Sequence, residues 1–293
     1  SVALMRFFPA RDGRSVITPT IAGWRYSGLV ILNLPSGTTE IDGTYLADAE
    51  GALIPLNAIE ANVEVDGQKF SLAGRLGVFT GGTDWLYVAP QSRIRITLNK
   101  PSEFALATAV ADKKFPTQYV EKSEQIEIRG AGDATREVRP FMHPDVFTDA
   151  HRLMAVELVT PDGNWSSFPP HRHDNIPGSP AHNEEIYYFR IGKEKSAHGN
   201  SEGWGFHRTY SAPNDPEFFD DAISVRDGDI YLVPRGFHGP CVAMPGYPMY
   251  YLNVLAGPSE KRTMDFCDDP NHAWIRESWK TQSPDPRVPW ICE

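Results

Sequence analysis

Short apolar runs alternate with turn signals along most of the chain. Ten segments rich in β-branched and aromatic residues are separated by glycine, proline and Asx turns, at residues 26–34, 62–72, 84–90, 93–98, 124–130, 152–160, 184–191, 204–210, 229–234 and 249–257. Short strands at this spacing are typical of an all-β sandwich or barrel. Only residues 269–280 have a pattern that favours a helix.

The pattern of strands and turns also occurs twice. Residues 63–90 and 222–240 both place an Asp-Gly turn between strand-like runs, followed by a glycine turn. We therefore predict two β-barrel domains in tandem, at residues 1–128 and 145–293, joined by a linker at 129–144. The linker has a Gly130-x-Gly132 pair but no third glycine or following helix, which favours a flexible connector over a dinucleotide site. Trp24, Phe79 and Trp85 are the expected core aromatics of the first barrel.

Composition narrows the partners and the compartment. Hydrophobic residues make up 41% of the 293 residues and charged residues 23%, and no apolar run approaches the roughly 20 residues of a membrane helix. The net charge of −10 argues against nucleic acid or an anionic membrane as partner, although a local arginine can still bind a small anion. Three scattered cysteines and no evident secretory leader indicate free thiols in the cytoplasm.

Histidines and glutamates cluster just before and within one predicted strand. His171 and His173 are two residues apart, so in an extended segment both side chains leave the same face. Neutral imidazoles in such a pair suit a borderline divalent ion. Either Glu184 or Glu185 can add a carboxylate, because neighbours on a strand point in opposite directions, and a turn shaped by glycine and proline ends at His238.

The spacing of these residues resembles the two motifs of the cupin superfamily. Glu185 is followed by six residues and Gly192, as in the first cupin motif, and this count selects Glu185 over Glu184. Residues 228–238 resemble the second motif. The chain departs from the pattern in an eleven-residue gap between His173 and Glu185, which leaves His182 as a competing ligand, and in a single residue before His238.

The chain further resembles the 5-deoxy-glucuronate isomerase family of inositol catabolism, which is related to the uronate isomerases of pectin breakdown. The resemblance runs from about Gly23 to Ile275 and rests on "GWRYSGLVILNL", "FTGGTDWLYVAP", "WSSFPPHRHD", "EEIYYFRI", "VPRGFHGP", "PGYPMYYLNVLAGP" and "DPNHAWI". It implies an all-β bicupin that converts 5-deoxy-D-glucuronate to 5-dehydro-2-deoxy-D-gluconate. His207 stands where the family more often has glutamine.

The expected chemistry assigns roles to further residues. His171, His173, Glu185 and His238 would hold one divalent ion, for which zinc or manganese is favoured and iron or nickel stays open. The other candidates are Tyr187, Tyr251 and Asn253 as proton donors or relays, with core packing as the alternative, and Arg208 as a fork for the substrate carboxylate, with Arg235 as second choice. Glu184 is expected on a charged outer face.

Two other classes of function remain open. Three histidines and a glutamate can also hold iron in a cupin dioxygenase, and a metal-stabilised binding barrel is a third possibility. The polar and aromatic strand faces at Tyr187, Arg208 and Asn253 argue against an inert barrel. A small uronate-type substrate and a homo-oligomer are the expected partners.

The distribution of histidines predicts where the metal is bound. The chain has no histidine before His143, so we expect one metal equivalent per chain, bound in the second half. Elemental analysis of the purified protein measures this ratio. A second stoichiometric metal within residues 25–115 would contradict the prediction.

Overall fold

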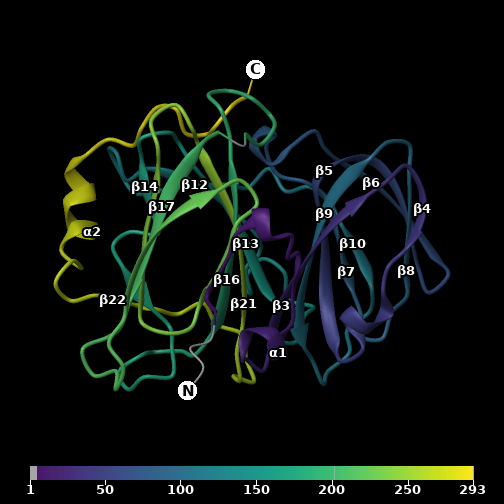
Figure 1. Ribbon diagram of the computed structural model, residues 1–293, viewed down its shortest axis with the longest axis horizontal. Coiled ribbons are helices and arrows are strands. Elements are labelled where there is room, and N and C mark those ends of the chain that lie inside the picture. The colour runs from purple at the N-terminus through teal and green to yellow at the C-terminus, as the bar shows by residue number, and fades with distance from the viewer. Residues whose placement is uncertain (1–4, 201, 293) are drawn as a thin grey trace.

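Strands dominate the computed structural model, which describes residues 5–200 and 202–292 (Figure 1). The first half contributes a nine-stranded sheet system that is coloured purple to blue in the figure. Its strands are β2 (Val16–Ile17), β3 (Ser27–Leu34), β4 (Gly37–Glu40), β5 (Ala49–Val65), β6 (Gln68–Arg75), β7 (Trp85–Val88), β8 (Ile94–Leu98), β9 (Ser102–Val110) and β10 (Gln118–Val120). The long strand β5 pairs with β7 and β9 at its start and with β6 and β8 at its end, so it belongs to both layers.

The second half contains two further sheets. A seven-stranded sheet has the order β1-β19-β16-β21-β13-β12-β11, and a six-stranded sheet has the order β18-β17-β20-β15-β22, with β14 beside β20. Their strands are β1 (Phe7–Phe8), β11 (Glu127–Arg129), β12 (Arg136–Met142), β13 (Met154–Thr160), β14 (Trp165–Ser166), β15 (His171–Arg172), β16 (Glu184–Ile191), β17 (Trp204–Tyr210), β18 (Asp220–Arg226), β19 (Ile230–Val233), β20 (Phe237–Ala243), β21 (Met249–Ala256) and β22 (Cys267–Asp268). The all-β class predicted from the sequence is confirmed.

Helical segments are short. They are α1 (Pro19–Ala22), α2 (Ile275–Ser278) and the 3-10 turns Ala10–Asp12, Gly43–Leu46, Val78–Thr80 and Trp279–Thr281. The expected helix near residues 269–280 is present as α2 and the turn that follows it. Within the described residues, no helix has the length and apolar character to cross a membrane.

Three apolar layers hold the sheets together. One lies within the first half, and another lies within the second half between its two sheets. The third joins the halves, because it combines Leu29, Ile54 and Trp85 of the first with Ile186 and Leu252 of the second. The two large sheets therefore pack against each other face to face, as the central strands in Figure 1 show. Phe79 and Trp85 are fully buried as expected, whereas Trp24 is only partly buried.

Strand β16 divides its side chains between two of these layers. Ile186 and Tyr188 belong to the layer that joins the halves, whereas Tyr187 and Phe189 belong to the core of the second half. This division follows from the period of two residues in a strand. It therefore also fixes the directions of the two glutamates that begin β16.

Two buried carboxylates clamp the halves together in a reciprocal way. Glu184 accepts hydrogen bonds from the backbone N–H groups of residues 25, 26 and 27, at 2.9, 2.8 and 2.9 Å, where β3 begins. Glu50 of the first half accepts from residues 151, 152 and 153, at 2.9, 2.8 and 2.8 Å, just before β13. The expectation that Glu184 lies on a charged outer face is therefore wrong, because its carboxylate satisfies three backbone donors at the domain contact.

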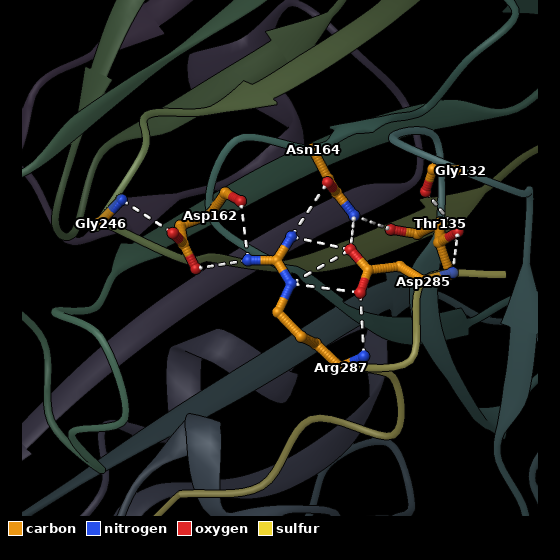
Figure 2. A network of polar contacts seen from close by, with 7 residues as sticks. All are labelled: Gly132, Thr135, Asp162, Asn164, Gly246, Asp285 and Arg287. Carbon is orange, nitrogen blue, oxygen red and sulfur yellow. Dashed lines mark hydrogen bonds and ion pairs between the residues drawn. The ribbon is translucent and has the colours of Figure 1, made fainter.

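Segments near both ends of the described chain contact the second half. Phe7 and Phe8 pair with β19. Near the other end, Arg287 contacts Asp162, Asn164 and Asp285, while the backbone N–H of Asp285 donates to Thr135 (Figure 2). These contacts fix the turn between β11 and β12.

The segment between the halves has regular structure. Residues 129–144 were expected to form a flexible connector, but they contain β12, which pairs with β13. β12 also pairs with β11 across the turn at Gly130 and Gly132. The exact domain boundaries stay a prediction.

A buried ion network across the contact predicts a large effect on stability. Glu157 of β13 binds Arg75 of β6 through two hydrogen bonds of 2.5 and 3.1 Å and also accepts from Tyr250. In Glu157→Gln the buried Arg75 loses its counter-charge, so we expect a loss of about 3–5 kcal/mol, measured by denaturant unfolding. The control Glu40→Gln breaks an exposed pair with Arg95 and should cost about 0–1 kcal/mol. Equal losses in the two variants would contradict this interpretation.

Candidate metal centre and pocket

Three buried side chains converge inside the second half. His173, Glu185 and His238 each offer one ligand atom, and these atoms all lie within 4.8 Å of one another. One carboxylate oxygen of Glu185, Oε2, lies 3.0 Å from Nε2 of His173 and 2.9 Å from Nε2 of His238. The structure thus brings together three of the four metal ligands expected from the sequence.

The two layers of the second half contribute different ligands. Glu185 projects from β16 of the seven-stranded sheet, on the face that also carries Tyr187. His238 belongs to β20 of the six-stranded sheet and is the register partner of His171 on β15. The cluster therefore lies between the two sheets of the second half and takes side chains from both.

His171 lies beside the cluster without joining it. Its ring centroid is 4.4 Å from that of His238, and its Nδ1 lies 3.0 Å from the carbonyl oxygen of Pro169. A carbonyl oxygen only accepts hydrogen bonds, so Nδ1 carries the proton in this contact and leaves Nε2 of the neutral ring with a lone pair. Metal-binding histidines are commonly oriented in this way.

The contacts of the cluster suit a cation. Nδ1 of His173 donates to the carbonyl of Asn183 at 3.2 Å, so in the neutral ring the lone pair of Nε2 meets the negative oxygen of Glu185. Neither ring nitrogen of His238 has a hydrogen-bond partner among the described residues, although the ring is buried. A divalent ion between these atoms would satisfy all three residues, and two imidazoles with one carboxylate are ordinary ligands for it.

The pKa shifts agree with this arrangement. Burial, followed by the nearby His238, holds the pKa of His171 well below its usual value, so the ring is neutral at neutral pH. For Glu185 burial acts in the opposite direction, but the His238 charge and the hydrogen bond that a protonated His173 donates together lower its pKa; although burial lowers the pKa of His173, Glu185 raises it overall. Glu185 is thus ionised and favours a cation beside it, a position that a metal ion can take in place of the His173 proton.

A cavity of about 180 Å³ opens beside the cluster. Three kinds of residue line it: the polar group His171, His173, Glu185, Tyr187, Ser167 and Asn253; the apolar group Val138, Val156, Leu158, Leu255, Met264 and Phe266; and the arginines Arg129, Arg136 and Arg276. Glu127, Pro140 and His143 complete the lining. Metal-binding side chains and three arginines thus line the same cavity.

Three of the predicted catalytic residues lie at or near this cavity. The Tyr187 and Tyr251 hydroxyls are each 2.9 Å from the hydroxyl of Ser167. Asn253 is the register partner of Tyr187, and its Nδ2 has no hydrogen-bond partner in the described chain. Burial raises the pKa of Tyr187 well above its usual value, so this phenol keeps its proton at neutral pH.

Arg208 does not face the cavity, which corrects the sequence-based prediction. It alternates on β17 with His207, which is fully buried, so Arg208 points to the outer face. There it binds Asp220 through two hydrogen bonds of 2.9 and 2.8 Å and stacks on Tyr210. Its aromatic neighbours share this outer face, which is why they gave no sign of a pocket.

The remaining candidates also lie outside the cluster. Arg235 pairs with Asp215 and Glu217 and does not line the cavity. His207 contacts Cys241 and Thr209 instead of a metal ligand. His182 is not in the metal-binding group either.

Sequence reasoning missed the three arginines of the cavity. Arg136 begins β12, and Arg129 ends β11, both in or next to the expected connector. Arg136, Val138 and Pro140 are two residues apart and line the cavity together. This alternation in "REVRPFM" is the signal that could have identified β12 and its inner face.

The chain is similar to proteins of one family over nearly its whole length. A family model described as the KduI/IolB family matches residues 4–275. A 5-deoxy-glucuronate isomerase of Geobacillus thermodenitrificans is 35% identical over 276 residues, which cover 92% of this chain and 94% of the relative. One from Bacillus subtilis strain 168 is 31% identical, covering 89% and 92%.

Solved structures support the same grouping. An IolB-like protein from Salmonella typhimurium LT2 has a TM-score of 0.78 at 28% identity, covering 92% of this chain and 99% of that one. An oxalate decarboxylase variant from Bacillus subtilis has a TM-score of 0.59 at 10% identity, with coverages of 92% and 80%, and shows the fold alone. The cupin-type architecture expected from the sequence is confirmed, with open sandwich layers where closed barrels were expected.

The opposite directions of Glu184 and Glu185 predict opposite effects of one substitution. Glu185→Gln removes a charged ligand, so metal content should fall at least tenfold, and thermal stability should fall only as far as it does when the wild type loses its metal. Glu184→Gln should retain the metal but destabilise the protein by about 1–3 kcal/mol, because an amide satisfies the three backbone donors poorly. Elemental analysis and thermal unfolding of both variants test this. The reverse assignment would show that the register of β16 is wrong.

Proposed function

The chain belongs to the KduI/IolB family, and on that premise we propose that it is a metal-dependent aldose–ketose isomerase. Its substrate would be 5-deoxy-D-glucuronate and its product 5-dehydro-2-deoxy-D-gluconate, in the catabolism of myo-inositol. The observation that carries the proposal is the convergence of His173, Glu185 and His238 on one point beside a polar cavity.

The reaction defines what the pocket must provide. Isomerisation moves one proton from C2 to C1 and another between the two oxygens, and negative charge develops on those oxygens. A divalent cation supplies a Lewis acid that stabilises this charge when it is bound. His173, Glu185 and His238 would hold the cation, with His171 as the fourth ligand; zinc or manganese is favoured.

The hydroxyl groups of the cavity supply proton donors. Tyr187 keeps its proton at neutral pH, so it donates to a substrate oxygen and is not the base. Ser167 connects its hydroxyl with that of Tyr251, which gives a short path along which a proton can move. The unpaired Nδ2 of Asn253 is a further donor for a substrate oxygen.

The apolar wall limits water around the reacting carbons. Val156 and Leu158 of β13 and Leu255 of β21 are nearly fully buried and line the same cavity as the metal ligands. Electrostatic interactions are stronger where water is excluded, which benefits both the donors and the cation. The apolar wall thus strengthens the interactions that the donors and the cation make with the substrate.

The expected setting is the bacterial cytoplasm. Cys241, Cys267 and Cys292 carry free thiols, which suit a reducing compartment. The relatives named above come from bacteria. We infer a homo-oligomer from the prevalence of symmetric assemblies among soluble enzymes.

Metal removal tests the proposed reaction. Chelation followed by dialysis should reduce conversion of 5-deoxy-D-glucuronate at least a hundredfold, and zinc or manganese should restore it, because the Lewis acid accounts for several kcal/mol of the barrier. Nuclear magnetic resonance follows the loss of the aldehyde signal.

The same samples distinguish an isomerase from a dioxygenase. Histidine and glutamate ligands also hold iron, so oxygen consumption is measured in parallel with the iron-loaded protein. We expect no oxygen uptake during turnover. Full activity of the metal-free protein, or oxygen uptake equal to substrate loss, would contradict the proposal.

A further inference from the structure

Resting on the proposed function, we propose that Arg136 and Arg276 bind the carboxylate of the substrate at the side of the cavity away from the metal ligands. This assignment replaces Arg208, which faces outward. It makes the two arginines specificity-determining residues that act on the end of the substrate that does not react.

Arg136 is a buried cation without a carboxylate partner. The residue is 2% exposed, and its side chain donates to the backbone carbonyls of Ala134, at 3.0 Å, and Phe168, at 3.1 Å. Its Nε has no hydrogen-bond partner among the residues that the structure describes. A guanidinium group in this state is costly, because burial removes water and nothing negative replaces it.

Three of the other four buried arginines are paired with a carboxylate, and the fourth, Arg262, donates to backbone carbonyls but does not line this cavity. Arg75 binds Glu157 at 2.5 Å, Arg139 binds Glu137 at 2.8 Å, and Arg172 binds Asp174 at 2.8 Å. Arg136 differs from all four in lining the cavity beside the metal-binding group. An anion that enters the cavity can therefore supply the counter-charge that the protein does not.

Arg276 stands next to Arg136. Both guanidinium groups lie over the ring of Trp279, at 5.4 Å for Arg136 and 5.7 Å for Arg276. Arg276 is held by two hydrogen bonds to Asp268, of 2.6 and 2.8 Å, and so keeps a fixed orientation. Burial and then the charges of Arg129 and Arg276 lower the pKa of Arg136 to about 10, a repulsion that a bound carboxylate relieves.

The positive side of the cavity is a local exception in an acidic chain. The net charge is −10, yet three arginines line this one cavity, and Glu127 of the lining is already paired with Arg129. The other lining carboxylate, Glu185, belongs to the metal-binding group. Arg276 is paired with Asp268, so the uncompensated charge is concentrated on Arg136.

The distance between the two sides fits a short sugar acid. The ring of Phe266 lies 5.0 Å from the His171 ring and 5.1 Å from the guanidinium carbon of Arg276, so one aromatic ring separates them. An extended six-carbon chain measures roughly 6 Å between its end carbons. A carboxylate at the arginines can therefore leave the other end at the metal ligands.

Surrounding contacts hold Arg136 in place before any ligand arrives. Its neighbour Thr135 accepts hydrogen bonds from Asn164, through the carbonyl oxygen, and from the backbone of Asp285, through Oγ1 (Figure 2). Arg287 in turn binds both Asn164 and Asp285. A preorganised donor loses less entropy on binding, so it contributes more affinity.

The arrangement also explains how the substrate is oriented. A carboxylate is itself a good metal ligand, so a uronate could bind the cation by its wrong end. Guanidinium groups pair with carboxylates through two parallel hydrogen bonds and would hold that end away from the cation. Binding of the carboxylate by the arginines then places the aldehyde at the metal ligands, where it reacts.

The test compares two substrates in arginine variants of the metal-loaded protein. The substrates are 5-deoxy-D-glucuronate and the analogue with a hydroxymethyl group in place of the carboxylate. In Arg276→Gln we expect the preference for the uronate, as a ratio of kcat/KM values, to fall about 10- to 100-fold, chiefly through KM. Arg276→Lys should restore part of it.

Controls separate substrate recognition from folding. Metal content should be unchanged in Arg276→Gln, and Arg95→Gln, which breaks an exposed ion pair in the first half, should keep the wild-type preference. Arg136→Gln should show the larger effect; if this buried variant does not fold, the partly exposed Arg276 carries the test.

Two results overturn the inference in different ways. If the wild type converts the uronate and both arginine variants keep its preference, or if Arg208→Gln alone abolishes it, the carboxylate is bound elsewhere. If the wild type converts neither compound, the proposed function fails and the assignment of the arginines fails with it.

Discussion

The two-residue period of β16 is the constraint on which both the domain contact and the site depend. Glu184 and Glu185 are neighbours in the sequence, so their side chains must leave opposite faces of the strand. The first satisfies three backbone donors of the other half, and the second lies within 3.0 Å of two imidazoles. A shift of one residue would destroy both arrangements at once.

The metal-binding group also depends on both layers of the second half. Its histidines come from or next to the six-stranded sheet, whereas its carboxylate comes from the seven-stranded sheet. The backbone carbonyl of Asn183 orients the ring of His173, and that of Pro169 orients the neighbouring ring of His171. Because these supports lie in separate segments, the ligands converge only when the sandwich has formed, and a bound cation would stabilise the folded state.

Local patterns were sufficient to predict ten strand-containing segments, although not β9 or β12, and three side chains that converge in the structure. Each of the ten strand-like segments contains a strand of the structure, and the count of six residues between Glu185 and Gly192 selected the glutamate that joins the histidines. These features depend on short-range interactions, because strand periodicity and turn residues reflect the conformation of the backbone over a few neighbouring residues. The whole-chain resemblance added the family and its reaction.

Long-range packing explains what the sequence did not predict. Arg208 was assigned to the pocket from its aromatic neighbours, but Phe206 and Tyr210 share its outer face, and only the pairing of β17 with β18 and β20 sets which face points inward. Glu184 was expected in solvent because its three partners are more than 150 residues away. Arg136 was not predicted as a site residue because residues 129–144 were interpreted as a connector.

X-ray absorption at the edge of the bound metal is the sharpest test of the metal-binding group, because it reports the ligands themselves. We expect scattering from at least two imidazoles, those of His173 and His238, together with a carboxylate oxygen, and the loss of that oxygen contribution or of the metal itself in Glu185→Gln. A sulfur ligand, or a spectrum without imidazole scattering, would contradict this expectation. Such a result would place the metal outside the cluster on which the proposed reaction rests.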